Sequence, residues 1–215
     1  MSYSIREIYY TLQGEGANAG RPAVFCRFTG CNLWSGREED RSKAICKFCD
    51  TQFVGVDGIR GGFFSSPDAL AEEVDSCWPN TYDSRDGRNK LVVCTGGEPL
   101  LQLDEPIIEA LHDKGFSVAV ETNGTKLPPP GVDWICVSPK ANAECVLQKG
   151  DELKLVFPQV GGEPSKYEVY DFRRFFLQPM DGEAQEENMK MAIQYCLEHP
   201  QWELSIQTHK LIGLP

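Results

Sequence analysis

Three cysteines form the pattern with the clearest chemical meaning in this 215-residue sequence. Cys31 is followed, after fourteen residues, by the pair Cys46 and Cys49, and this loop comes directly after an apolar run, 23–30. Three thiolates can hold three irons of a four-iron cluster and leave the fourth iron open, whereas a closed electron-transfer cluster takes four cysteines. An open iron indicates that a small molecule binds there. The pattern therefore predicts a catalytic iron–sulfur centre.

Two other kinds of site use cysteines in related patterns. A structural zinc site needs four closed ligands, usually two Cys-x-x-Cys pairs or one pair with two histidines. The chain has three histidines, and none is near the loop in sequence. A dithiol redox pair would use Cys46 and Cys49 alone and would leave Cys31 unexplained. Both alternatives stay open on the cysteines alone.

The elements that must position these residues follow from hydrophobic patterning. Six short runs rich in β-branched and aromatic residues indicate strands that are buried on both faces. These runs are Ala23–Thr29, Lys90–Cys94, Phe116–Glu121, Trp134–Ser138, Glu152–Phe157 and Arg174–Gln178. Helical patterns cover Ser66–Cys77, Leu103–Lys114 and Glu183–Glu198.

This alternation of strands and helices predicts βαβ units with a mainly parallel sheet. At about 30 residues per unit, the chain is too short for eight units. We therefore expect an α/β fold built as a partial, six-stranded (β/α) barrel. An open doubly wound sheet is the alternative.

Five of the predicted strands end in polar or glycine-rich turns. The turns are Gly30-Cys31, Thr95-Gly-Gly-Glu-Pro99, Glu121-Thr-Asn-Gly124, Ser138-Pro-Lys140 and Gln178-Pro-Met-Asp181. Barrels and open α/β sheets bind their ligands at this edge. In the second turn, two glycines let the backbone approach a ligand and Glu98 adds a carboxylate, which suits an ammonium group. The turn is neither a phosphate loop nor a dinucleotide fingerprint.

Composition excludes several classes of function. A formal net charge of −11 argues against binding of large nucleic acids, which calls for a basic face. No run approaches the roughly 18 apolar residues that a membrane span requires. Nine cysteines, an odd number, without an N-terminal apolar signal region indicate a reducing compartment, the cytoplasm. The length fits one domain, residues 1–215.

Taken together, the motifs resemble those of the radical S-adenosylmethionine enzymes. More narrowly, the chain is similar over essentially its whole length to the 7-carboxy-7-deazaguanine synthase family. The motifs that carry the resemblance are Tyr10–Gly16 (Tyr-Thr-Leu-Gln-Gly-Glu-Gly), Gly30–Trp34, Phe48–Thr51, Thr95–Pro99, Glu121–Gly124 and Ser138–Lys140. The superfamily usually has three residues between its first two cysteines, so residues 32–45 form an insertion, and longer spacings occur in this family.

The resemblance implies a single radical S-adenosylmethionine core domain with an N-terminal segment and a modified cluster loop, 31–49. It implies a 4Fe–4S cluster on Cys31, Cys46 and Cys49, S-adenosylmethionine on the open iron, and Mg2+ with Thr51 as its protein ligand. The residues expected around S-adenosylmethionine are Phe48, Cys49, Asp50, Gly97, Glu98, Ser138, Pro139, Lys140, Gln178, Pro179, Met180 and Asp181.

The implied substrate is a carboxylated tetrahydropterin. The residues expected around it are Leu12, Gln13, Gly14, Glu15, Arg27, Thr95, His209 and the C-terminal Pro215. Arg27 suits the substrate carboxylate through a two-pronged charge-assisted contact. A structural acid is the alternative partner of Arg27.

The implied reaction is that of a lyase, which converts 6-carboxy-5,6,7,8-tetrahydropterin to 7-carboxy-7-deazaguanine with loss of ammonia in queuosine biosynthesis. The resemblance also implies an external one-electron reductant, flavodoxin-like or ferredoxin-like, and a homodimer. Two alternatives belong to other classes. An activating enzyme for a glycyl-radical protein would share the cluster, and a zinc-bound binding module would not be an enzyme.

Overall fold

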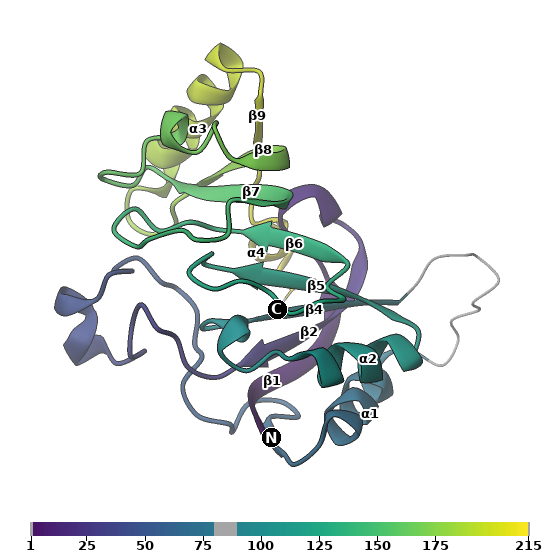
Figure 1. Ribbon diagram of the computed structural model, residues 1–215. Helices are drawn as coiled ribbons and strands as arrows, with labels where there is room; N and C mark the ends of the chain where they lie inside the picture. The colour runs from purple at the N-terminus through teal and green to yellow at the C-terminus, as the bar shows by residue number, and fades with distance from the viewer. Residues whose placement is uncertain (1, 80–89, 215) are drawn as a thin grey trace.

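The computed structural model describes residues 2–79 and 90–214, in which nine strands form one sheet in the order β3-β1-β2-β4-β5-β6-β7-β8-β9 (Figure 1). The strands are β1 (Tyr3–Leu12), β2 (Pro22–Phe28), β3 (Gly62–Phe64), β4 (Lys90–Gly96), β5 (Phe116–Thr122), β6 (Trp134–Val137), β7 (Lys149–Phe157), β8 (Asp171–Pro179) and β9 (Trp202–Leu204).

The six predicted strands are confirmed as β2 and β4 to β8, and each pairs in parallel with the next along the chain. Because their order in the sheet follows their order in the sequence without reversal, the sheet is wound in one direction, as in a barrel. β3 and β9 lie at opposite ends of that order, so this part of the chain forms a partial barrel. The alternative of a doubly wound sheet is therefore wrong.

Three strands extend the sheet beyond the predicted six. β1 and β3 pair antiparallel at one edge, and β9 adds a short parallel strand beside β8. β1 carries a bulge between Ile5 and Glu7, where the pairing register with β2 shifts. A bulge next to a site re-aims the side chains that follow it.

The three predicted helices are confirmed to within two residues at each end. The helices are α1 (Pro67–Cys77), α2 (Glu105–Asp113) and α3 (Gln185–Glu198), and the short α4 (Thr208–Ile212) follows β9. Ser66 caps α1 by accepting a hydrogen bond from the Ala69 N–H, and Asp104 caps α2 in the same way through Ile107. The crossovers between β5 and β8 consist of turns and a 3-10 helix (Pro164–Lys166).

Alternation along the strands separates two faces of the sheet. Val92 and Cys94 face a core shared with α1 and α2, which lie beside the β1–β5 part of the sheet (Figure 1). Leu91 and Val93 face the concave side, where they pack with Ala23 and Ala119. The next concave position on β4 is Thr95, at the C-terminal end of the strand. The site is therefore built on the layer above this apolar floor.

No helix in residues 2–79 and 90–214 combines the length and apolarity needed to cross a bilayer.

Candidate active site

A cavity of about 400 Å³ opens at the C-terminal edge of the parallel strands. Most of the residues predicted from the sequence line it: Leu12, Gln13, Gly14, Glu15, Arg27, Cys46, Phe48, Cys49, Asp50, Thr51, Thr95, Gly97, Ser138, Lys140, Gln178, Pro179, Met180, Asp181 and His209. They converge because parallel strands of one sheet end at the same edge. Cys31, Glu98 and Pro139 lie outside this lining, and the predicted contact of Pro215 falls outside the described residues.

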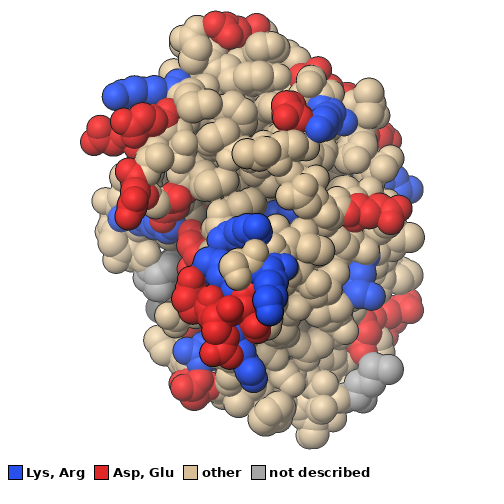
Figure 2. All heavy atoms as spheres, turned by 90° about the vertical axis from the view of Figure 1, so that its left-hand side faces the viewer, with Lys and Arg blue, Asp and Glu red and all other residues tan. Residues whose placement is uncertain are grey.

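The cavity carries a mixed set of charges. Five basic and five acidic side chains line it: Arg6, Arg27, Lys140, Lys154 and Lys210, with Glu7, Glu15, Asp50, Glu121 and Asp181. Figure 2 shows Lys and Arg intermixed with Asp and Glu around the middle of one face of the molecule. This balance differs from the strongly acidic whole chain, so the site can accept a ligand that carries both an ammonium and a carboxylate.

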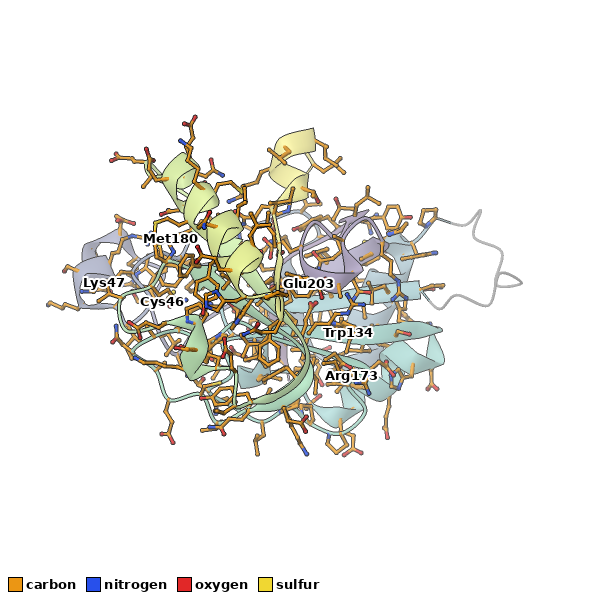
Figure 3. All side chains as sticks on the ribbon, turned by 90° about the horizontal axis from the view of Figure 1, so that it is seen from above. Cys46, Lys47, Trp134, Arg173, Met180 and Glu203 are labelled. Carbon is orange, nitrogen blue, oxygen red and sulfur yellow. The ribbon has the colours of Figure 1, made fainter. Side chains whose placement is uncertain are left out.

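The cluster loop brings two of its thiols, those of Cys46 and Cys49, to one end of the cavity. Cys46 donates a hydrogen bond to Cys49, which raises the pKa of Cys46 and lowers the pKa of Cys49. Cys31 is half-buried, and burial raises its pKa although the Leu33 N–H donates to its Sγ at 3.4 Å. In Figure 3, Cys46 lies close to Met180 at this end, while Trp134 and Arg173 lie toward the other end of the molecule.

The cluster loop offers three thiols as donors, and three thiolates suit a cluster with one open iron. Within residues 2–79 and 90–214, no three His, Cys, Asp or Glu side chains converge to hold one metal ion. Thiolates of a cluster each bind a different iron, so they need to surround a space without converging on one point. A Cβ at Gly97 would lie 2.1 Å from the Gly30 carbonyl oxygen and 2.9 Å from the Cys31 Cβ, so only glycine allows the two turns to meet there.

Phe48 and Lys140 lie beside the thiols. The Lys140 ammonium is 5.8 Å from the centre of the Phe48 ring, and it donates to the Ser138 carbonyl at 2.8 Å and to the Ser138 Oγ at 2.7 Å. An aromatic face next to fixed polar groups suits a flat heterocycle with a hydroxylated sugar.

Glu98 does not face the cavity. Its carboxylate is fully buried and accepts hydrogen bonds from the Leu100 N–H, the Thr122 hydroxyl and the Asn123 N–H, at 3.0, 2.7 and 2.8 Å. Burial raises the pKa of Glu98, although these donors act in the opposite direction. The side chain therefore ties the turn after β4 to the turn after β5, and it leaves Gly97 to face the ligand.

Lys210 joins three distant segments across the mouth of the cavity. Its ammonium donates to Asp50 of the cluster loop, at 2.8 Å, and to Asp181 after β8. The hydrogen bond to Lys210 lowers the pKa of Asp181. The sequence predicted both aspartates as ligand contacts but gave no signal for Lys210.

A buried charge network anchors the Gln-Gly-Glu-Gly segment to the barrel. The Lys154 side chain is 3% exposed, and its ammonium pairs with Glu15 and, at 3.4 Å, with Glu121. Gln13 donates to Glu121 at 2.8 Å, and Gln178 donates to Glu15 at 3.1 Å. Burial acts to raise the pKa of Glu15, but the charge and hydrogen bond of Lys154 outweigh it and hold this pKa below its ordinary value.

Gly16 completes the same segment with a backbone conformation that favours glycine. Its φ is +62°, and a Cβ there would lie 2.6 Å from a carboxylate oxygen of Glu152. The neighbouring Ala17 N–H donates to that carboxylate at 2.7 Å. The second glycine of the motif is thus needed for the close approach to β7.

Arg27 has the structural partner that the sequence left open as an alternative. Its Nε donates to Glu7 at 2.8 Å, and Nη2 donates to the Tyr9 hydroxyl at 3.0 Å. These bonds use two of the five N–H donors of the guanidinium. Arg27 still lines the cavity, so the pair with Glu7 orients it without occupying all of its donors.

The C-terminal segment returns to the N-terminal motif. His209 lies on α4 and packs so closely on Gly14 that a Cβ there would be 2.2 Å from the histidine Nδ1. The Thr208 N–H and hydroxyl both donate to the Gly14 carbonyl, at 3.0 and 2.9 Å. His209 is therefore held at the cavity by backbone contacts far apart in sequence.

The remaining lining residues had no assigned role in the sequence-based prediction. They are Arg6, Glu7, Tyr9, Phe25, Gln52, Gly96, Glu121, Thr122, Asn123, Lys154, Val156, Gln207 and Lys210. Three of them, 121–123, belong to a strand-end turn that the sequence singled out. Tyr9, Glu7, Phe25 and Lys154 reach the cavity by alternation along their strands, a signal that is present in the sequence once the concave face is known.

Comparisons with known proteins agree closely with one another. No protein-family model matches the chain. It is 60% identical over 215 residues to the 7-carboxy-7-deazaguanine synthase of Caulobacter vibrioides and 58% identical over 215 residues to that of Bordetella pertussis, with 100% of both chains covered in each case. The solved structure "Crystal structure of QueE from Escherichia coli" matches with a TM-score of 0.68 at 26% identity, and the match covers 96% of this chain and 94% of that chain.

Proposed function

We propose, because this chain belongs to the 7-carboxy-7-deazaguanine synthase family, that it converts 6-carboxy-5,6,7,8-tetrahydropterin to 7-carboxy-7-deazaguanine with loss of ammonia. It is a lyase of the radical S-adenosylmethionine class in queuosine and 7-deazapurine biosynthesis. One observation carries the assignment to this cavity. Two cluster-loop cysteines, the Gln-Gly-Glu segment and a C-terminal histidine all line the same cavity. The first and the last of these, Gln13 and His209, are more than 150 residues apart in the sequence.

The family implies a 4Fe–4S cluster and S-adenosylmethionine as cofactors, and we assign Cys31, Cys46 and Cys49 as the cluster ligands. When bound, these cofactors supply the one-electron radical chemistry that removes a hydrogen atom from the substrate carbon bearing the carboxylate. The hydrogen bond between Cys46 and Cys49 supports this role because it places the two thiols side by side at the cavity. A zinc module or a dithiol redox enzyme would leave the rest of the cavity without a purpose.

We assign the S-adenosylmethionine side of the cavity to the end nearest the cluster loop. Phe48 offers its face to the adenine, and the hydroxyl of Ser138 is held in place for the ribose by Lys140. The turn after β4 offers Gly97 to the methionine ammonium, while the buried Glu98 and Pro139 support the turns on either side. Residues 178–181 after β8 complete this end.

We assign the pterin to the end formed by the N-terminal motif and α4. Arg27, held by Glu7 and Tyr9, supplies free N–H donors for the substrate carboxylate. Gln13 and Glu15 offer an amide and an ionised carboxylate to the amino and ring N–H groups of the pterin, and His209 lies beside them. Leu12, Gly14, Thr95 and the terminal Pro215 complete the assignment.

Mg2+ is proposed to bind at Thr51. This hard cation prefers oxygen ligands and often takes several from water and substrate. The Thr51 hydroxyl lines the cavity 3.5 Å from an Asp50 carboxylate oxygen, which supports an oxygen-rich environment at that point.

The wider setting is also a proposal. We infer that residues 1–215 form one radical S-adenosylmethionine core domain, since one sheet contains every strand of the described chain. The protein is expected to act in the cytoplasm as a homodimer within a tRNA-modification pathway. It would take electrons from a flavodoxin-like or ferredoxin-like reductant and bind neither nucleic acid nor membrane.

The proposal is tested by anaerobic cluster reconstitution and incubation with dithionite, S-adenosylmethionine, Mg2+ and 6-carboxy-5,6,7,8-tetrahydropterin. Mass spectrometry should detect 7-carboxy-7-deazaguanine. Cys46→Ala should form neither this product nor 5′-deoxyadenosine, whereas Cys94→Ser, in the apolar core, should lower stability and retain turnover. A brown, reconstituted protein that leaves the pterin unchanged would overturn the substrate, and full activity of Cys46→Ala would overturn the cluster assignment.

A further inference from the structure

The insertion that separates Cys31 from Cys46 is a packed structure. It contains a 3-10 helix, Glu38–Lys43, and is anchored by Trp34, whose side chain is buried. The Trp34 ring packs edge-to-face on Phe53 at 5.7 Å, and its indole N–H donates to the Arg37 carbonyl at 3.1 Å. The insertion therefore presents a fixed surface to the segment 46–49 that follows it.

One side chain of that surface, Arg41, holds the cluster segment directly. Its Nη1 donates to the carbonyl oxygens of Lys47 and Cys49, at 2.9 and 3.1 Å. Its Nε donates to both carboxylate oxygens of Glu38, at 2.7 and 2.8 Å, and its guanidinium carbon lies 4.1 Å from the centre of the Trp34 ring. The aromatic face and the carboxylate thus fix the plane of the guanidinium, which in turn fixes two backbone carbonyls.

We propose that Arg41 is a positioning residue for the cluster, which acts through the backbone of the segment 46–49. The two carbonyls that it binds belong to Lys47 and Cys49, the neighbours of Phe48 in the sequence. The two N–H groups of Arg41 Nη1 therefore restrain the backbone on both sides of the aromatic ring and next to both thiols. Figure 3 shows Lys47 at the outer edge of the molecule, whereas the neighbouring Cys46 lines the cavity, so the segment turns these two side chains to different sides. This inference rests on the proposed assignment of Cys46 and Cys49 as cluster ligands.

The fork geometry, not the charge, is the property that Arg41 contributes. A lysine ammonium would keep the charge but lacks the planar, pre-organised pair of donors and stacks less well on an aromatic ring. Arg41→Lys and Arg41→Gln should therefore behave alike. Arg37→Gln provides a matched control in the same insertion, because the Arg37 side chain is 70% exposed and reaches Glu39 only at 4.0 Å.

The test is the rate at which the reconstituted holoenzyme loses its visible cluster absorbance after addition of EDTA. The variants lose both backbone hydrogen bonds of Arg41, so the segment 46–49 opens more often and exposes the cluster to the chelator. The cluster should be lost about tenfold faster in Arg41→Gln and Arg41→Lys than in the wild type, which is equivalent to about 1.4 kcal/mol. Arg37→Gln should stay within about twofold of the wild type. In the cluster-free protein, amide hydrogen exchange of residues 46–51 should accelerate in both Arg41 variants while α3 keeps its protection.

Each result has a defined consequence. If Arg41→Gln loses its cluster and exchanges its amide hydrogens at the wild-type rates, the positioning role is overturned. If Arg41→Lys behaves like the wild type, charge alone matters, which also contradicts the proposal. Faster exchange across α3 as well would mean general unfolding and would likewise overturn a local role. A wild-type protein that binds no iron would instead refute the proposed function on which the inference depends.

Discussion

Removal of the Lys154 charge is the most informative perturbation of the buried network. The side chain is 3% exposed and pairs with Glu15 and Glu121. Lys154→Met keeps most of the side-chain volume but leaves two largely buried carboxylates, 13% and 20% exposed, without their cation. Loss of one partner of a buried ion pair costs about 3–5 kcal/mol. We expect the free energy of unfolding of the cluster-free protein to fall by about 3 kcal/mol at pH 8. The lower end of the range applies because glutamine side chains still donate to both carboxylates.

The loss of unfolding free energy in Lys154→Met should depend on pH, and the protonation of Glu15 determines whether it grows or shrinks as pH falls. Burial acts to raise the pKa of Glu15, and Lys154 outweighs burial, so the folded-state pKa lies below its ordinary value of 4.5. A lowered pKa stabilises the wild type above the unfolded-state pKa, and this contribution is lost only as pH falls through the lowered value. In Lys154→Met, burial is opposed only by the weaker hydrogen bonds of the glutamines and by His209, so the pKa of Glu15 rises and protonation stabilises the variant as pH falls. The difference in unfolding free energy should be about 1 kcal/mol smaller at pH 5.5 than at pH 8, given about 1.4 kcal/mol per pKa unit.

Urea denaturation followed by tryptophan fluorescence at both pH values measures this difference. Lys149→Met is the matched control, because Lys149 is exposed at the start of the same strand, β7. Its effect should stay within about 0.5 kcal/mol at both pH values, as is usual for a surface substitution. A loss below about 1 kcal/mol for Lys154→Met, or one that does not change with pH, would refute the reasoning that the ammonium keeps Glu15 ionised.

Three further changes test other parts of the site. Thr51→Val should raise the KM for the pterin and weaken the response of the rate to added Mg2+, and an unchanged Mg2+ response would remove Thr51 from the metal site. Gly14→Ala should raise the KM at least about tenfold, with kcat less affected, because its Cβ displaces His209; steady-state kinetics with the wild-type KM would contradict this. Glu98→Gln should lower the urea-derived free energy of unfolding by about 2 kcal/mol, since an amide cannot accept all three buried hydrogen bonds, and a wild-type value would show that these bonds are dispensable.

The sequence was sufficient for the elements that carry strong local patterns. The six strands β2 and β4 to β8 are short apolar runs because both of their faces are covered, and α1 begins at a capping residue followed by proline. β1 has no such run. It carries Arg6 and Glu7, which face the site, and a bulge interrupts its alternation. β3 and β9 have three residues each, too few for any periodicity to show.

The sequence also identified most of the candidate site, because polar turns that end successive parallel strands must meet at one edge of the sheet. It could not decide the direction of each side chain. Glu98 stands in the most specific of those turns, yet its carboxylate points into the protein and binds the next turn. Arg41 lies in an insertion whose charged composition resembles an ordinary solvated surface, and only the packing of Trp34 brings its guanidinium onto the cluster segment.

Lys154 shows most clearly what the tertiary structure decided. In the run Glu152-Leu-Lys-Leu-Val156, alternation separates two faces, and the sequence predicts both as buried without naming a partner for the Lys154 charge. The single-wound sheet curves the face that carries Lys154 into the barrel interior, where Glu15 from a loop at the other end of the chain completes the ion pair. Periodicity fixes which residues share a face, because that depends on local backbone geometry. Which charged groups meet on the interior face depends on contacts between segments far apart in the sequence, so only the folded chain determines the partners of Lys154.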